Sequence, residues 1–174
     1  FRNLFNDFYA RDTSRKIRAI LNAKANAGEH MGKQPYGYLR DKDNPKQWVV
    51  DGEAAEVVKK IFALCVDGKG PMQIARILQK EKILTVNSYY AKCAGKPLPD
   101  NPYLWDANSV SKILARFEYC GHTVNFKTYS KSNKLKKRYE NTPENRRIFR
   151  NTHEAIIDEK LFERVQELRA SKRR

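Results

Sequence analysis

The stretch "DGEAAEVVKKIFALCVDGKGPMQIARILQK", residues 51–80, predicts two helices joined by a tight turn. Apolar residues recur at helical spacing through its first half, and Gly68 and Gly70 end this pattern. Asp51 stands where the first helix needs a cap, and Pro71 suits the first turn of the second helix. Such a pair is typical of a helix-turn-helix unit, although any two-helix hairpin shares the pattern.

A third helix, over about 107–117, is predicted within "WDANSVSKILARFEYCGH", residues 105–122, with Asp106 as its cap. Its apolar residues recur at i, i+3, i+4 and i+7, which predicts one buried face: Val110, Ile113, Leu114 and Phe117. Together the three helices would form a helix-turn-helix-like bundle over about 51–118. The remaining face of the third helix is polar: Asn108, Ser109, Ser111 and Lys112.

Residues 1–28 read as one long helix that Gly28 ends. Its apolar stripe is narrow, which is typical of a helix that packs on a neighbour, on another chain or along an extended ligand. The sequence opens inside this helix without a start signal, so we expect the helix to continue from an upstream domain. Cations lie between its apolar residues: Arg11, Arg15, Lys16 and Arg18.

Short extended segments and a final helix account for the rest of the chain. The segments "YGYLR" and "QWVV" predict a small hairpin, and residues 84–104 read as a loop with two proline-containing turns. Residues 119–150 are β-like and basic, and "HTVNFKTY" and "RRIFRN" are expected to pair within them. Asp158 would cap a last helix over about 158–172. The predicted class is α+β, mainly α.

The formal net charge of +15 over 174 residues indicates an anionic partner, with nucleic acid as the first candidate. A basic protein that is merely soluble is the alternative. No apolar run approaches the ~18 residues of a membrane span, and no secretory leader is visible, so we expect a cytoplasmic protein that associates with the nucleoid when bound to DNA. The three cysteines lack paired spacing, which favours reduced thiols.

The sequence contains no Gly-rich phosphate loop, no HExxH and no GxSxG motif. Its three histidines lie far apart along the chain, and each is expected at the surface or in a turn. The tripeptide "CGH" at residues 120–122 has no second cysteine pair with which to complete a tetrahedral metal site. We therefore expect no catalysis by this chain alone, no cofactor and no metal.

Basic and aromatic side chains are the candidate DNA contacts. In "GKQPYGYLR", the side chains of Lys33, Tyr36, Tyr38 and Arg40 suit phosphate contacts, with hairpin packing as the alternative for the tyrosines. The polar face of the third helix lies where a recognition helix touches base edges, and an ordinary capped helix is the alternative. The other candidates are basic: Arg116, Lys127, Lys134, Lys136, Lys137 and Arg138.

Four segments in fixed order resemble the large serine recombinases, which are site-specific DNA integrases and transposases of mobile elements. They are "NDFYARDTSRKIRAIL", the stretch from "GKQPYGYLRD" to "GPMQIARIL", "WDANSVSKILARFEYCGH" and "HEAIIDEKLFERVQELR". Each segment alone is a weak signal, and the ordered set is specific. The resemblance implies that residues 1–28 are the linker helix from a catalytic domain absent from this chain, and that residues 29–174 are the recombinase DNA-binding domain.

The resemblance also implies an activity for the parent protein. In that family a serine of the catalytic domain attacks a DNA phosphodiester, and the strands are exchanged and rejoined. The implied partner is double-stranded DNA at one arm of an attachment site, bound by a parent that acts as a dimer or tetramer. The third helix would then enter the major groove, the long helix would cross the minor groove, and residues 127–138 would hold phosphates.

Two other functions remain open from the sequence. A helix-turn-helix transcription regulator would use the same bundle, but no effector domain is visible. A coiled-coil protein-interaction module would self-associate through the long first helix, which leaves the net charge of +15 unexplained.

Overall fold

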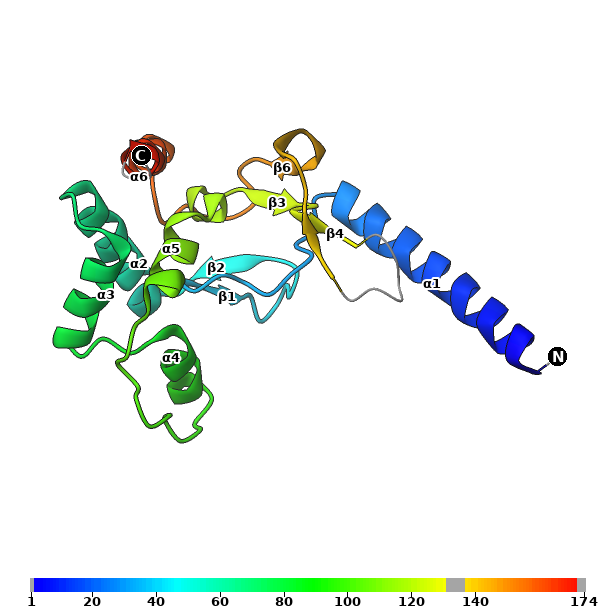
Figure 1. The fold of residues 1–174 in the computed structure, drawn as a ribbon, viewed down its shortest axis with the longest axis horizontal. Helices are drawn as coiled ribbons and strands as arrows, with labels where there is room; N and C mark the ends of the chain where they lie inside the picture. Colours follow the sequence, from blue (N-terminus) through cyan, green and yellow to red (C-terminus); the bar gives the residue numbers. More distant parts are fainter. Residues whose placement is uncertain (1, 131–136, 172–174) are drawn as a thin grey trace.

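The computed structural model describes residues 2–130 and 137–171. Helices dominate this part of the chain, and short antiparallel strand pairs join them, which confirms the predicted α+β, mainly α class (Figure 1). In chain order the elements are α1 (Arg2–Asn26), β1 (Tyr38–Arg40), β2 (Trp48–Val50), α2 (Gly52–Val66), α3 (Pro71–Lys80), α4 (Val86–Cys93), α5 (Ala107–Leu114), η1 (Phe117–Cys120), β3 (Thr123–Asn125), β4 (Thr128–Tyr129), β5 (Tyr139–Glu140), η2 (Pro143–Asn145), β6 (Arg147–Phe149) and α6 (Glu159–Ser171).

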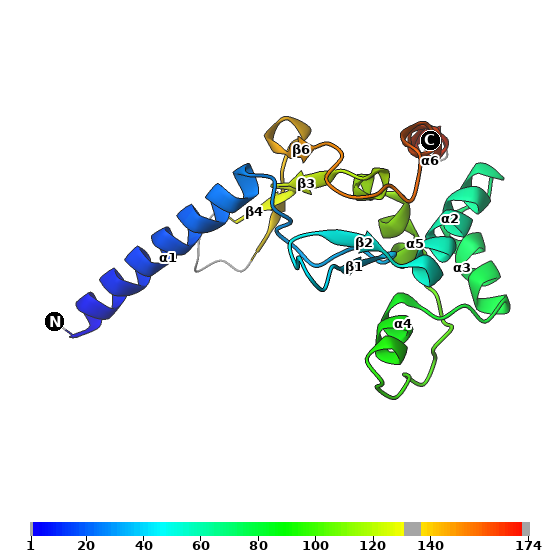
Figure 2. The same cartoon turned by 180° about the vertical axis from the view of Figure 1, so that it is seen from behind.

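A three-helix bundle of α2, α3 and α5 forms the helical body, and α6 packs against α2 (Figures 1 and 2). Most residues predicted to face inward do so: Ile74 and Leu78 of α3 are fully buried, as are Val110 and Leu114 of α5. The helix α5 ends at Leu114, earlier than predicted, and Phe117 is half-buried in η1. Apolar residues at helical spacing place these side chains on one face of each helix, and burial of those faces stabilises the bundle. The predicted bundle is therefore confirmed.

The structure corrects the expectation of a loop over residues 84–104, because α4 forms in their first half. Thr85 caps this helix, since its Oγ1 accepts a hydrogen bond from the backbone N–H of Ser88. Tyr89 is buried, and its hydroxyl donates to the Asp51 carboxylate with both O–O distances at 2.8 Å. That carboxylate makes no cap for α2, contrary to the sequence expectation. The helix α4 is thus an insertion between α3 and α5, tied to the start of α2.

Three two-stranded antiparallel sheets lie among the described residues. The predicted hairpin is β1–β2, in which Tyr38 is opposite Val50 and Arg40 is opposite Trp48. The expected long-range pair is β3–β6. A further pair, β4–β5, continues the chain beyond β3 as a narrow ribbon that the sequence did not predict.

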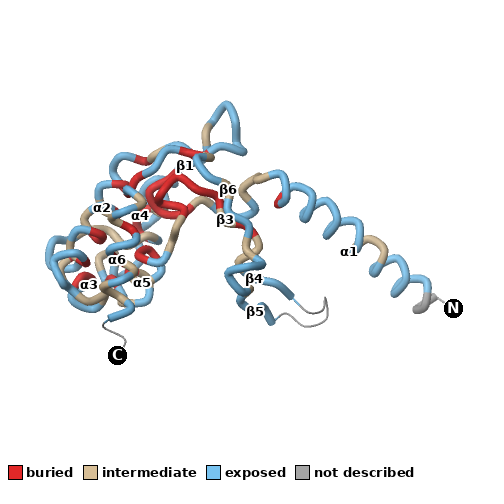
Figure 3. Tube along the Cα trace, turned by 90° about the horizontal axis from the view of Figure 1, so that it is seen from above, coloured by how far each residue is buried: buried red, intermediate tan, exposed pale blue. Residues whose placement is uncertain are grey.

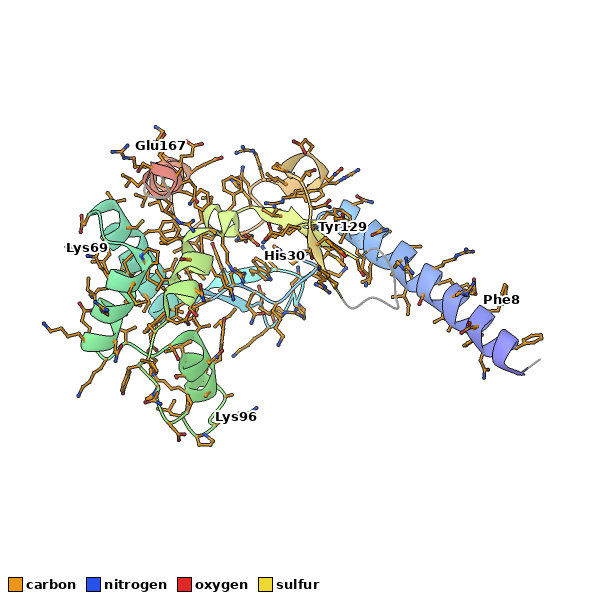
Figure 4. All side chains as sticks on the ribbon, in the orientation of Figure 1. Phe8, His30, Lys69, Lys96, Tyr129 and Glu167 are labelled. Carbon is orange, nitrogen blue, oxygen red and sulfur yellow. The ribbon has the colours of Figure 1, made fainter. Side chains whose placement is uncertain are left out.

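The helix α1 projects from the body as an arm (Figures 1 and 3). Its side chains are largely exposed, and Phe8 points away from the rest of the molecule (Figure 4). The chain leaves the helix at Gly28, whose φ of +82° is a conformation that favours glycine. The Asn125 amide of β3 donates to the carbonyl oxygens of Ala25 at 2.9 Å and Glu29 at 3.0 Å. The described arm is therefore anchored at its carboxyl end.

Just after this anchor, aromatic rings pack around His30 and form the joint between the arm and the body (Figure 4). The His30 ring stacks on Trp48 with centroids 3.7 Å apart and lies 5.3 Å from the His153 ring. Burial lowers the pKa of His30 to about 4 and also lowers the pKa of His153, so both rings are neutral near pH 7. His122 is buried as well. The expectation of three separate surface or turn histidines is therefore wrong, because the fold buries two of them and stacks the third.

Candidate nucleic-acid interface

The helix α5 begins with the cap that the sequence predicts. The Asp106 carboxylate accepts hydrogen bonds from the backbone N–H of Ser109 at 2.9 Å and from the Ser109 hydroxyl at 2.6 Å. These two bonds are the main reason that the pKa of Asp106 lies below its ordinary value. The Ser109 side chain is therefore engaged in capping, and the first turn of α5 is fixed where its neighbours project outward.

The polar residues of α5 divide between two directions. Asn108 and Lys112 are exposed, while Ser109 and Arg116 are half-buried. Ser111 is half-buried, and its backbone carbonyl oxygen accepts a hydrogen bond from Arg169 of α6 at 3.3 Å. The helix thus offers Asn108 and Lys112 as the most exposed of the predicted side chains, and Ser111 lies closer to α6.

An open cavity of about 490 Å³ lies between α4 and α5 and is bordered by the segment that leads to β1. Lys112 and Arg116 of α5 line it on one side, and Asn87 and Tyr90 of α4 line it on the other. Sequence reasoning missed Asn87, Tyr90 and Tyr119 as cavity residues. No local pattern could have found them, because the cavity exists only where α4 packs beside α5.

The structure corrects the expectation for the hairpin tyrosines. Tyr38 is fully buried, and its hydroxyl donates to the carbonyl oxygen of Glu154 at 2.7 Å. Tyr36 is 5% exposed and packs edge-to-face against Tyr89. Both rings are packed in the core, as the alternative of hairpin packing predicted, and Tyr36 also lines the cavity. The cations of the same segment, Lys33 and Arg40, are exposed.

The cations of α1 lie along the exposed arm. Lys16 pairs with Asp12 at 2.8 Å and Arg11 lies 3.9 Å from Asp7, both in i, i+4 geometry. Ion pairs this exposed contribute little to stability and exchange readily for another anion. Arg15 and Arg18 are exposed on the same arm. The four predicted arm cations are therefore accessible to an extended anionic ligand.

Residues 127–138, which were predicted to hold phosphates, are only partly within the described residues. Lys127 is half-buried and forms an ion pair with the buried Glu118 carboxylate, so its charge is engaged inside the protein. Lys137 and Arg138 are exposed at the start of β5, with the Lys137 amine 5.4 Å from the centre of the Tyr139 ring. Lys134 and Lys136 lie outside the described residues.

The sequence model of the Recombinase family matches residues 52–172, from the start of α2 through α6. The chain belongs to the recombinase family. This match covers the bundle, the ribbon and most of the residues that line the cavity, and it confirms the resemblance to the large serine recombinases. The comparison with curated proteins gives no match.

Two solved structures are similar to this recombinase-family chain. One is described as "Crystal Structure of a LSR-DNA Complex", with a TM-score of 0.43, 19% identity, and coverage of 90% of this chain and 38% of that one. The other is described as "Sequence Requirements of the Listeria innocua prophage attP site", with a TM-score of 0.41, 20% identity, and coverage of 92% and 51%. The chain therefore spans between two fifths and about half of these two chains.

Among residues 2–130 and 137–171, no group of three or more His, Cys, Asp and Glu side chains has the arrangement of a metal site. None of the helices described is both long enough and apolar enough to span a membrane.

Proposed function

We propose that the chain binds double-stranded DNA and reads one arm of an attachment site on behalf of a serine site-specific recombinase. The observation that carries this proposal is the geometry of α5. Asn108 and Lys112 project from a capped helix whose opposite face is buried in the bundle. A recognition helix reads base edges in the major groove with such residues, because asparagine pairs with adenine and lysine reaches guanine.

The arm and the ribbon would supply contacts that do not depend on base sequence. The exposed cations of α1 suit the backbone phosphates of a duplex that runs beside the arm, near the minor groove. Lys137 and Arg138 would hold phosphates from the ribbon, and Lys33 and Arg40 from the segment around β1. The net charge of +15 supports a footprint of many phosphates.

In this proposal the chain positions DNA and performs no chemistry itself. The serine that attacks the phosphodiester would belong to another part of the parent protein, and recombination would proceed in a dimer or tetramer on DNA. A plasmid-cleavage assay with the purified chain should therefore give no product.

Selection from a pool of random duplexes tests the sequence-reading role. The purified chain should enrich one related set of sequences, and fluorescence anisotropy at moderate salt should show tighter binding to these than to random duplexes. Lys112→Ala should reduce that preference. Lys69→Ala, a change of another lysine in the turn between α2 and α3, should leave it intact (Figure 4). Equal binding of enriched and random duplexes would contradict the proposal.

The exposed apolar stripe of α1 favours a second function, self-association. Phe5, Phe8 and Tyr9 are each more than 70% exposed, which is unusual for large apolar side chains gathered on one helix. Static light scattering without DNA tests this function. A dimer that Phe8→Ser converts to a monomer would support it, and a monomer at all concentrations would exclude it.

A further inference from the structure

Two tyrosines with buried hydroxyls, Tyr90 and Tyr119, line the cavity between α4 and α5. Tyr119 of η1 is fully buried, the hydroxyl oxygen of Tyr90 is buried as well, and both residues line the cavity. Neither hydroxyl has a hydrogen-bond partner within residues 2–130 and 137–171. A buried hydroxyl without a partner destabilises a fold, so the partner of each of these hydroxyls comes from outside the protein, as a water molecule or as a ligand.

These hydroxyls act as donors. Burial is the largest cause that raises the pKa of both Tyr119 and Tyr90, so both phenols keep their protons. Arg116 opposes this rise for both tyrosines, which places its guanidinium group within electrostatic reach of the two hydroxyls. Two neutral donors and one cation thus belong to residues that line the same cavity, and such a set suits an acceptor that carries negative charge.

The carboxylates around the cavity are engaged elsewhere. Asp106 lines the cavity, but its two oxygens accept hydrogen bonds from Ser109. Asp51 accepts the hydroxyl of Tyr89, and Glu118 pairs with Lys127. Lys112, at the cavity wall, is exposed and adds a second cation to Arg116. Among the described residues, the cavity therefore combines two hydroxyl donors and two cations with a single lining carboxylate, Asp106, whose oxygens are bonded to Ser109.

We infer that this cavity seats one phosphate of the DNA backbone, held by the hydroxyls of Tyr90 and Tyr119 and by the guanidinium group of Arg116. The inference rests on the proposed function, because α5 would bring the edge of the major groove to this cavity. A phosphate here would fix how deep α5 enters the groove. The cavity volume of about 490 Å³ and its open mouth admit a phosphodiester with part of its adjoining sugars.

The change Tyr119→Phe tests the site, because it removes the hydroxyl and keeps the ring. The free protein should melt at the same or a higher temperature, since an unpaired buried hydroxyl is lost. Affinity for the selected duplex should fall about tenfold, since a hydrogen bond to a charged acceptor is lost. Tyr90→Phe should behave in the same way.

The matched control is Tyr38→Phe, because the Tyr38 hydroxyl already has a partner inside the protein. This variant should melt at a lower temperature and bind the duplex as tightly as the unchanged chain. If Tyr119→Phe lowers the melting temperature, or if it leaves DNA affinity unchanged, the inference is overturned. In the second case, water alone fills the cavity.

The salt dependence of binding distinguishes the contribution of the hydroxyls from that of the charged side chains. Arg116→Gln should reduce the slope of log K against log salt concentration by about 0.9, whereas Tyr119→Phe should lower K without a change of slope. A scan of the duplex with single methylphosphonates should find one position that weakens binding of the unchanged chain and has no further effect on Tyr119→Phe. An equal penalty at every position for both proteins would overturn the inference.

This test distinguishes failure of the site from failure of the proposed function. If the chain shows no preference for any duplex, the proposed function fails before the cavity is probed. If sequence preference persists and depends on Asn108 while both phenylalanine variants bind normally, only the phosphate site fails.

Discussion

The helices α5 and α1 both present cations to solvent, but the protein holds them in different ways. The helix α5 is short, capped by Asp106, and buried along one face through Val110 and Leu114. The helix α1 spans 25 residues and is exposed along most of its length, with hydrogen bonds from Asn125 near its end. A side chain on α5 therefore has a fixed position, as base reading requires, while the arm offers charge that suits a sequence-independent backbone.

The largest expected effect comes from removing an anchor of α5. Leu114→Ala deletes a fully buried side chain at the centre of the bundle and should lower the free energy of unfolding by about 2–5 kcal/mol. Ile17→Ala on the arm removes an apolar side chain that is 52% exposed and should change the free energy of unfolding by less than about 0.5 kcal/mol. Urea unfolding followed by circular dichroism measures both, and similar losses would contradict the contrast between the two helices.

A smaller effect is expected at the polar face of α5. Asn108→Ala should cost about 1–3 kcal/mol of discrimination between the selected duplex and a variant with one base pair changed. The side chain is exposed, so the melting temperature should stay the same. Competition anisotropy with both duplexes measures the discrimination.

The matched change on the arm is Arg15→Ala. It should weaken binding to all duplexes alike and reduce the slope of log K against log salt concentration by about 0.9, because one phosphate contact is lost. If Asn108→Ala and Arg15→Ala alter specificity and salt dependence to the same extent, the division between a reading helix and a charged arm is wrong.

The Asp106 cap of α5 should contribute about 1 kcal/mol to the free energy of unfolding. Asp106→Ala removes the acceptor for the Ser109 N–H and hydroxyl, and it should lower the free energy of unfolding by roughly that amount. Asp106→Asn keeps an acceptor and should restore most of the loss. Urea titrations of the three proteins decide this, and an unchanged midpoint for Asp106→Ala would show that the cap is dispensable.

The contrast between local and distant contacts explains what the sequence could predict. Helical periodicity identified α2, α3 and α5, because their apolar spacing is a local pattern. It missed α4, whose place depends on the bond between Tyr89 and Asp51 across 38 positions of sequence. The basic and aromatic pattern made Tyr38 a candidate phosphate contact, with hairpin packing as the alternative, and a hydrogen bond to Glu154, 116 positions away, shows that Tyr38 is part of the core. The base-reading candidates on α5 came from local pattern, while the cavity beside them needed the fold.

The joint between the arm and the body should give the protein a pH-dependent stability. The pKa of His30 is lowered to about 4 in the fold, mainly by burial, so the unfolded chain binds more protons between about pH 6.5 and pH 4. The free energy of unfolding should therefore fall as the pH drops from 7 to 5. His30→Gln should flatten this dependence, with a remainder from His153, whose pKa is also lowered. Urea midpoints measured across this range test the effect, and equal slopes for both proteins would show that protonation of His30 does not oppose folding.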